Sequence, residues 1–125
     1  MSKVSKSIYY FGIYMIIVGT SLVFIPNLLL QLANLPTTDQ VWIRLGGLLS
    51  AILGGYYIQA AKNNLTLFYR ATVYGRFIFA FGVLTFVLFN FVKPILLIIS
   101  VVDVLGALLT AKLLKDENNT IKLKA

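Results

Sequence analysis

Long apolar segments separated by short polar stretches dominate the chain. A helix rises 1.5 Å per residue, so about 20 mostly apolar residues are needed to cross a hydrocarbon layer ~30 Å thick. Four segments meet this requirement, and we expect membrane-spanning helices at about 8–25, 41–61, 71–92 and 94–114. The pattern predicts an all-α fold, an integral membrane four-helix bundle with a single membrane domain over 1–125.

Proline and polar residues mark the ends of these segments. Pro26 ends the first span, Lys62 ends the second, and Pro94 suits the first turn of the fourth. The leucine-rich segment 27–35 is too short to cross, so we expect a short interfacial helix between the first two spans. Residues 115–125 form a polar C-terminal tail, which we expect to be frayed.

Basic residues are distributed unevenly between the two ends of the predicted spans. Cytoplasmic loops of membrane proteins carry an excess of Lys and Arg, and this excess sets the orientation. With both termini in the cytoplasm, the cytoplasmic side collects Lys3, Lys6, Lys62, Arg70, Lys112, Lys115, Lys122 and Lys124. Only Lys93 and Arg44 fall on the other side. The sequence therefore predicts an N-in, C-in, multi-pass protein.

Composition agrees with a membrane location and excludes several kinds of chemistry. Apolar residues make up 59% of the chain and charged residues 12%, with a mean hydropathy of +0.89. The chain contains no cysteine and no histidine, so we expect no metal site and no cofactor. The net charge of +7 is spread over several short segments, which argues against nucleic-acid binding. The expected partner is the lipid bilayer.

Small residues recur along the second span at the spacing that allows close helix packing. Gly46, Ser50 and Gly54 form one stripe, and a second stripe lies beside it. The second stripe contains Gly47, Ala51 and Gly55. These stripes suit contacts within one bundle, and they also suit a homodimer interface, so both a monomer and a homodimer remain open.

Three ionisable residues fall inside the predicted spans: Arg44, Arg76 and Asp103. A charge near the centre of a bilayer costs at least about 2.5–3.5 kcal/mol, so each of them needs a partner, water or a path to the interface. Both arginines are long enough to reach an interface, whereas Asp103 lies near the midplane on a short side chain. We expect Asp103 to be neutral or paired with an arginine, and we favour Arg76 over Arg44.

Other polar side chains fall at a similar depth and predict a small polar chamber in the bundle. These candidates for a ligand or proton site are Tyr14, Tyr56 or Tyr57, Gln59, Tyr74 and Thr110. One interpretation is an internal salt bridge that fixes the register of the helices. The other is a ligand or proton site built on Asp103.

Three segments carry a resemblance to a known group of proteins. They are residues 42–47, which read Trp-Ile-Arg-Leu-Gly-Gly, and residues 68–76 and 102–110. With the connector from Pro26 to Pro36, they resemble small bacterial four-span membrane proteins that belong loosely to the DoxX-like group. The group is largely without assigned activity, so the resemblance implies a fold and a bacterial inner (plasma) membrane rather than a reaction.

Three functional hypotheses follow from these residues. The first is a non-enzymatic bundle that binds an apolar small molecule, a lipid or a membrane-protein partner around the internal arginine and aspartate. The second is a proton-coupled small transporter in which Asp103 alternates between two protonation states. The third, and the least supported, is a lipid-modifying membrane enzyme, because no catalytic set of residues is recognisable.

Overall fold

The computed structural model describes residues 2–124, and they are almost entirely helical. The elements are α1 (Lys3–Phe24), α2 (Pro26–Leu32), α3 (Val41–Lys62), α4 (Thr66–Leu88), a 3-10 turn η1 (Pro94–Leu96) and α5 (Leu97–Lys124). Within this described part, four helices are long and apolar enough to cross a membrane. The all-helical prediction is confirmed, and the four helices indicate a multi-pass membrane protein.

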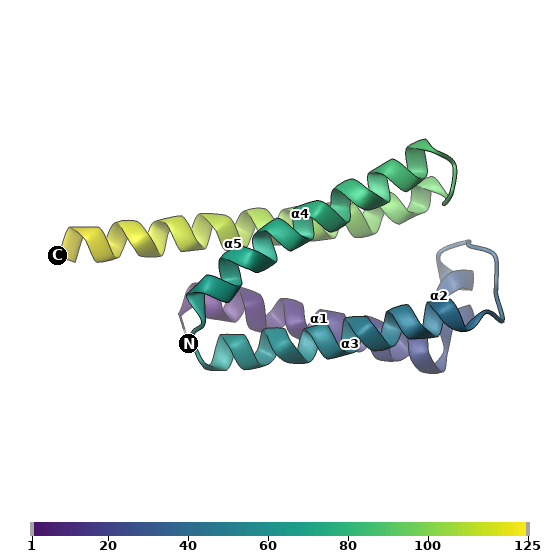
Figure 1. Cartoon of the computed structure of the whole chain (residues 1–125), viewed down its shortest axis with the longest axis horizontal. Helices are drawn as coiled ribbons and strands as arrows, with labels where there is room; N and C mark the ends of the chain where they lie inside the picture. Colours follow the sequence, from purple (N-terminus) through teal and green to yellow (C-terminus); the bar gives the residue numbers. More distant parts are fainter. Residues whose placement is uncertain (1, 125) are drawn as a thin grey trace.

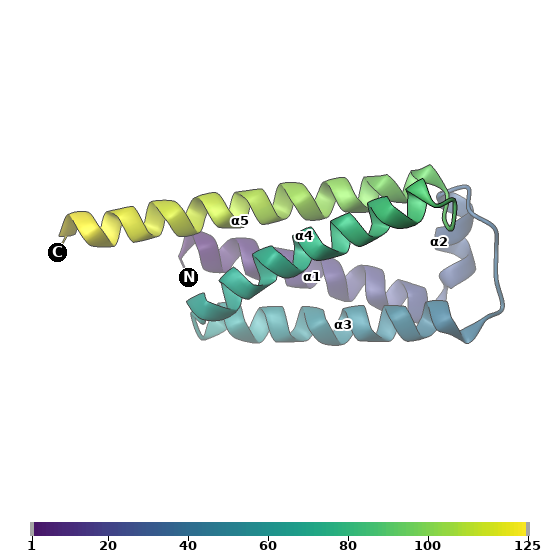
Figure 2. The ribbon, with the colours of Figure 1, turned by 45° about the horizontal axis from the view of Figure 1, so that its top comes forward.

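The four long helices form two antiparallel hairpins, each made of helices that are neighbours along the chain (Figure 1). One hairpin contains α1 and α3, the other contains α4 and α5, and α1 also packs along α5. Both termini lie at one end of the bundle, here called the terminal end. At the opposite connector end lie α2 and the α4–α5 turn. Figure 2 shows α4 crossing obliquely, close to α3 at the terminal end and far from it at the connector end.

Glycines bring α1 and α3 into close contact. A Cβ atom at Gly54 would lie 2.5 Å from the carbonyl oxygen of Gly12, and one at Gly12 would lie 2.8 Å from that of Gly54. Gly19 and Gly47 face each other in the same way seven residues further along. Because only hydrogen atoms fit between these backbones, the pairing of α1 with α3 depends on glycine at these positions.

The remaining glycines of the two predicted stripes do not take part in this contact. A Cβ atom at Gly46 or at Gly55 would have no atom within 4 Å. Ser50, by contrast, lies at the α1 contact, where its hydroxyl donates to the carbonyl of Met15 at 3.3 Å. The face of α3 that packs on α1 therefore contains Ser50 and Gly54 of the first predicted stripe and Gly47 of the second.

Three helices end by the same device, an asparagine in the left-handed conformation. Asn34, Asn64 and Asn90 have φ values of 56°, 53° and 60° and follow α2, α3 and α4. The next residue then donates its amide to the carbonyl five positions earlier, as Phe91 does to Phe86 at 2.9 Å. Asparagine tolerates this conformation, which completes a Schellman cap and satisfies carbonyls that a helix end leaves free.

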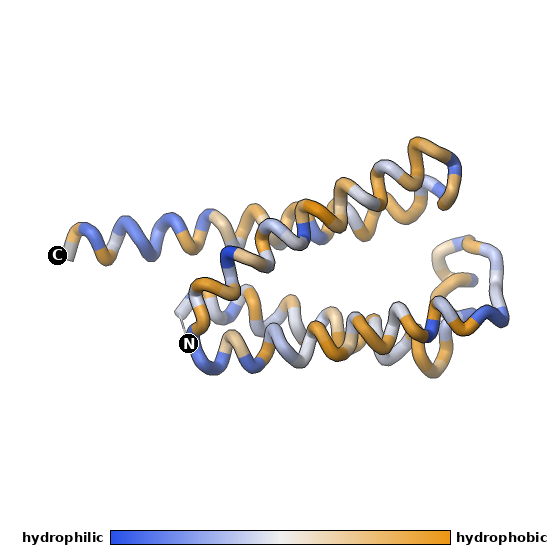
Figure 3. The backbone as a smooth tube through the Cα atoms, viewed as in Figure 1, coloured by the Kyte–Doolittle hydropathy of each residue, from blue (hydrophilic) through white to orange (hydrophobic). Residues whose placement is uncertain are grey.

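The helix limits differ from the predicted span limits at several positions. Helix α4 begins at Thr66 instead of residue 71 and ends at Leu88 instead of residue 92, because the turns centred on its flanking asparagines fix both limits. Helix α5 continues to Lys124, where we expected a frayed tail. The hydrophilic extension visible in Figure 3 prolongs an existing helix, so it needs no new nucleus, and no Gly or Pro interrupts it.

The terminal end holds the tightly packed core. Its buried residues include Ile8 of α1, Tyr57 and Ala60 of α3, and Tyr69 of α4. The hydroxyls of Tyr69 and Ser5 lie 2.7 Å apart, and the Tyr69 hydroxyl also contacts the carbonyl of Ala60 at 3.2 Å. Three helices are therefore joined at this end by apolar packing and by buried hydrogen bonds.

Candidate functional site

Arg76 occupies the point where all four long helices meet. It lies about 15 Å from the start of α4, a helix about 33 Å long, and only 4% of its surface is exposed. The guanidinium carbon lies 4.1 Å from the ring centroid of Phe11 on α1 and 5.5 Å from that of Tyr57 on α3. The faces of aromatic rings attract cations, so the two rings stabilise the charge without neutralising it.

Two threonine hydroxyls supply the hydrogen bonds of the guanidinium group. Its Nη1 donates to Thr110 Oγ1 on α5 at 3.3 Å, and its Nη2 donates to Thr72 Oγ1 at 3.4 Å. Its Nε is buried and has no hydrogen-bond partner in the described residues. Of the three guanidinium nitrogens of this arginine, Nε is therefore the one left without a hydrogen bond inside the described bundle.

The directions of the surrounding hydrogen bonds follow from counting protons. Ser7 gives its only hydroxyl proton to the carbonyl of Val4 at 2.7 Å. In the 3.1 Å contact between Ser7 and Thr110, the donor must therefore be Thr110. The lone pairs of Thr110 then remain available for Arg76. Thr72 likewise donates to the carbonyl of Tyr69 at 2.7 Å, which leaves its oxygen to accept from Arg76.

Gly106 on α5 provides the space that the guanidinium occupies. A Cβ atom at Gly106 would lie 3.4 Å from Arg76 Nη1 and 3.4 Å from the ring of Phe11. A side chain larger than alanine at this position would therefore displace the cation or the ring. The sequence pattern places Gly106 on the same face of α5 as Asp103 and Thr110, and the structure explains why that position is small.

Asp103 lies on this face of α5, nearer the connector end, and is 7% exposed. It precedes by about one turn Gly106, where an added Cβ atom would lie 3.4 Å from Arg76 Nη1. None of the hydrogen bonds in the described part of the chain involves the carboxyl group of Asp103. One turn further toward the connector end, Ser100 donates to the carbonyl of Ala80 at 3.4 Å.

Of the two expectations for Asp103, a neutral carboxyl group or a pair with an arginine, the described residues do not form the pair with Arg76. Arg76 donates to the two threonines instead. Thr110 is seven residues from Asp103, which corresponds to about 10 Å along the axis of α5. Because Thr110, Phe11 and Gly106 together fix the guanidinium, it stays short of the carboxylate. The site contains an arginine and a carboxyl group that share the interior of the bundle without a hydrogen bond between them.

The structure brings only some of the predicted site residues together. Arg76, Thr110 and Asp103 share the interior, and Tyr14 lies at its edge, 36% exposed. The side chains that point outward are Tyr56 (58% exposed), Tyr74 (70% exposed) and Gln59. Arg44 is also exposed, and its Nη1 donates to the carbonyl of Val23 near the end of α1.

Sequence reasoning missed two contributors to the site and left a third open. Phe11 gave no signal, since phenylalanines are common in membrane helices. Ser7 lies before the predicted start of the first span, so it was not among the candidate residues. Tyr57 was an open alternative to Tyr56, and only the rotation of α3 selects it. One signal favours Tyr57 over Tyr56: it lies seven residues, or two turns, after Ser50 and therefore on the same face of the helix, which packs on α1.

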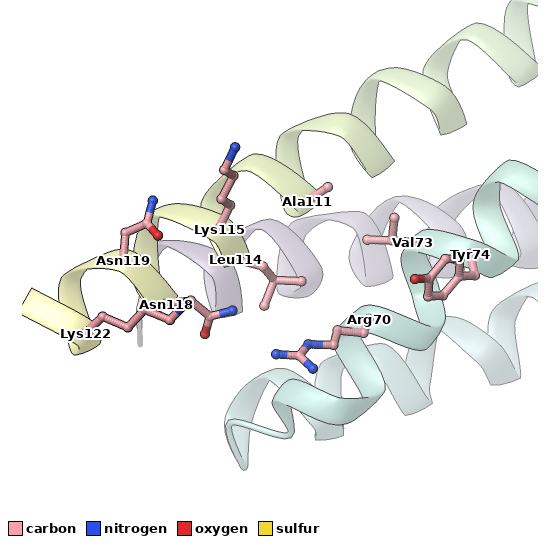
Figure 4. A pocket seen from close by; sticks show the side chains of 9 residues that line it. All are labelled: Arg70, Val73, Tyr74, Ala111, Leu114, Lys115, Asn118, Asn119 and Lys122. Carbon is pink, nitrogen blue, oxygen red and sulfur yellow. The ribbon is translucent and has the colours of Figure 1, made fainter.

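Cavities lie at both ends of the bundle and are separate from Arg76 and Asp103. At the connector end, a cavity of about 660 Å³ lies between residues 30–40 and residues 90–96. At the terminal end, a groove of about 450 Å³ lies between α4 and the extension of α5 (Figure 4). This second cavity is called the terminal groove below. Its lining residues are Arg70, Val73, Tyr74, Ala111, Leu114, Lys115, Asn118, Asn119 and Lys122.

Comparison of the chain with protein-family models, curated proteins and solved structures finds no match. The resemblance to the DoxX-like group therefore stays a prediction.

Proposed function

We propose that the protein is a non-enzymatic, multi-pass membrane protein that binds the polar end of a small amphiphilic molecule at Arg76 and Asp103. The observation that carries this proposal is the buried Nε of Arg76, which has no hydrogen-bond partner in the described residues. Buried polar groups are usually satisfied. A donor left free in the centre of a bundle supports a role in binding an acceptor that comes from outside the chain.

The energetics of the site point the same way. A cation near the centre of a bilayer costs at least about 2.5–3.5 kcal/mol. The two hydrogen bonds of Arg76 measure 3.3 and 3.4 Å, longer than the ~2.7–2.9 Å of strong charged hydrogen bonds. Neutral partners at this distance only partly offset the cost. A ligand that accepts a hydrogen bond from Nε would reduce it further.

The two charged groups define the chemistry of the ligand. Arg76 needs a hydrogen-bond acceptor, Asp103 needs a donor, and a cation beside an anion favours a molecule without net charge. The surrounding helix faces are apolar, so the rest of the ligand is a hydrocarbon chain. A monoacylglycerol has these features, because it joins an ester carbonyl and two hydroxyls to one acyl chain. We expect it to enter from the connector end, where a cavity lies between residues 30–40 and residues 90–96.

Thermal unfolding of the full chain in detergent tests the proposal, with monoolein as the probe. We expect saturating monoolein to stabilise the wild-type protein by about 2–3 kcal/mol at a hundredfold excess over Kd. Arg76→Met should fold, because it removes a costly charge of similar length, and should lose this stabilisation. Arg44→Met, which removes an exposed arginine, is the matched control and should respond like the wild type.

A hydrocarbon without polar groups, such as octadecane, distinguishes specific binding from general effects of lipid. It should not stabilise the wild-type protein. Equal stabilisation of Arg76→Met and wild type by monoolein would overturn the proposal, as would an octadecane effect as large as that of monoolein.

We propose proton-coupled transport as an alternative function. One observation favours it: Asp103 is buried and has no hydrogen-bond partner in the described residues, so its carboxyl group is suited to gaining and losing a proton. Proteoliposomes that enclose a pH-sensitive dye test it under an imposed pH gradient. Asp103→Asn should abolish proton movement and leave thermal stability unchanged. Equal proton fluxes in Asp103→Asn and wild type would exclude transport through this residue.

We propose that the protein lies in a bacterial inner membrane with both termini in the cytoplasm. The support is the distribution of charge, because seven lysines and arginines with described side chains lie at the terminal end: Lys3, Lys6, Lys62, Arg70, Lys112, Lys115 and Lys122. The connector end has Arg44 and Lys93. This asymmetry is typical of cytoplasmic loops.

A further inference from the structure

We propose that the terminal groove binds the head group of an anionic phospholipid, with the phosphate against Arg70 and Lys122. This inference concerns a surface separate from Arg76 and Asp103 and does not depend on the function proposed above. The groove lies between α4 and the part of α5 that extends past the apolar segment. Its shape, polarity and charge each support the assignment.

The polarity of the terminal groove changes along its length. Val73, Ala111 and Leu114 form an apolar portion next to the membrane-spanning part of the helices. Asn118 and Lys122, one and two turns further along α5, form a polar portion. A phospholipid has the same sequence of groups, with acyl chains that end at a phosphate. A soluble anion would use only the polar half.

The charge of the groove is of one sign. Its lining includes the cationic Arg70, Lys115 and Lys122 and contains no acidic residue. The periodicity of α5 explains this separation, because each residue turns the helix by about 100°. The lining residues of α5 follow a spacing of three and four, which places Asp116 and Glu117 on other sides of the helix.

The side chains are arranged to surround an anion from two helices. Figure 4 shows Arg70 of α4 and Asn118 of α5 directed toward each other across the groove. Tyr74, one turn after Arg70, adds a hydroxyl on the same side. Arginine and amide donors of this kind recognise phosphate oxygens. The continuous helix to Lys124 is essential here, because a frayed tail would not hold Asn118 and Lys122 opposite Arg70.

Native mass spectrometry of the full chain in micelles that contain equal amounts of phosphatidylglycerol and phosphatidylcholine tests the proposal. The groove variant is Arg70→Gln/Lys115→Gln/Lys122→Gln. The matched control, Lys3→Gln/Lys6→Gln/Lys62→Gln, removes the same charge from exposed positions at the same end. Each cation near an anionic surface is worth about fivefold in binding. We therefore expect the groove variant to lose at least tenfold of the preference for phosphatidylglycerol.

Two further measurements separate the shape of the groove from its charge and the lipid from a soluble anion. Ala111→Phe fills the apolar half without changing the charge and should also weaken phosphatidylglycerol binding. Inorganic phosphate at the concentration of the lipid should not displace it. The proposal would be overturned by equal losses in the groove and control variants, by unchanged binding in Ala111→Phe, or by full displacement with phosphate.

The outcome is independent of the interior site. Arg76→Met should keep the preference for phosphatidylglycerol, because Arg76 does not line the terminal groove. The groove variant should keep the stabilisation by monoolein. Failure of one proposal therefore leaves the other measurable.

Discussion

Arg76 shows how a buried cation is accommodated without a counter-ion in hydrogen-bond contact. Two threonine oxygens and two aromatic rings surround the guanidinium. Thr110 is central to this arrangement, because its single hydroxyl donates a hydrogen bond to Ser7 and accepts one from Arg76. The residue thereby connects α1, α4 and α5 through one oxygen atom.

Thr110→Val tests the importance of this hydroxyl. Valine has the same shape, so the packing is preserved while one acceptor for Arg76 is lost. A buried donor without a partner costs about 1–3 kcal/mol, and we expect thermal stability to fall by this amount. Thr85→Val is the control, because Thr85 donates only to the carbonyl of Phe81 within its own helix. Its effect should stay within about 0.5 kcal/mol.

The chemical identity of the site is largely predictable from the sequence, and its geometry is not. Arg76, Asp103 and Thr110 stand out because charged and polar groups are rare inside membrane helices. The distance between Arg76 and Asp103 depends on where the guanidinium group rests. Phe11 and Gly106 decide that position, and neither residue type carries a signal for such a role. The sequence therefore left both a neutral Asp103 and a pair with Arg76 open, and the packing around the guanidinium group decides against the pair.

The two hairpins differ in how their helices are held together. Helices α1 and α3 approach at two glycine pairs, Gly12 with Gly54 and Gly19 with Gly47. In α4, by contrast, Gly75 and Gly82 have no atom within 4 Å of an added Cβ. The first hairpin is therefore sensitive to the size of single residues, whereas the glycines of α4 tolerate a larger side chain.

Gly54→Ala and its matched control Gly55→Ala test whether the contact between α1 and α3 requires glycine. The alanine methyl at residue 54 would lie 2.5 Å from the Gly12 carbonyl oxygen, so the helices must separate. We expect a loss of about 1–3 kcal/mol, as for other overpacked sites. Alanine at residue 55 meets open space and favours a helix, so stability should be unchanged or slightly higher. Equal effects in a thermal unfolding assay would contradict this packing.

Helix existence is easier to predict from this sequence than helix limits. Hydrophobic length alone identifies the four long helices, whereas their ends depend on capping. Helix α4 begins at residue 66 and ends at residue 88 because Asn64 and Asn90 adopt the left-handed conformation, in each case followed by a hydrophobic residue. That pair, asparagine and then an apolar side chain, recurs at Asn34 and is the signal that locates these turns.

On the scale of the whole molecule, packing is concentrated at the terminal end. The apolar core and the Ser5–Tyr69 hydrogen bonds lie there. Toward the connector end, α4 moves away from α3, and the packing of α1 along α5 is the largest contact between the two hairpins in the described residues. The terminal end therefore acts as the fixed base, and the connector end is where the hairpins can separate.

The proposed orientation can be tested with single cysteines, because the chain has none of its own. Asp39→Cys lies in the connector between α2 and α3, and Asn119→Cys lies near the C-terminal end. In intact cells, a membrane-impermeant maleimide should label Asp39→Cys and spare Asn119→Cys. Both should react after the membrane is permeabilised. Labelling of Asn119→Cys alone in intact cells would reverse the orientation.

During synthesis of the protein, the contact between Arg76 and Thr110 can form only after a delay. The two residues are 34 positions apart, which a ribosome covers in about 2–7 s at 5–20 residues per second. During that interval, the nascent chain contains the cation but lacks the partner that α5 supplies. The aromatic rings of Phe11 and Tyr57, made earlier, are already present. We therefore expect the first hairpin to hold α4 through the contacts of Arg76 with these two rings until α5 has been synthesised.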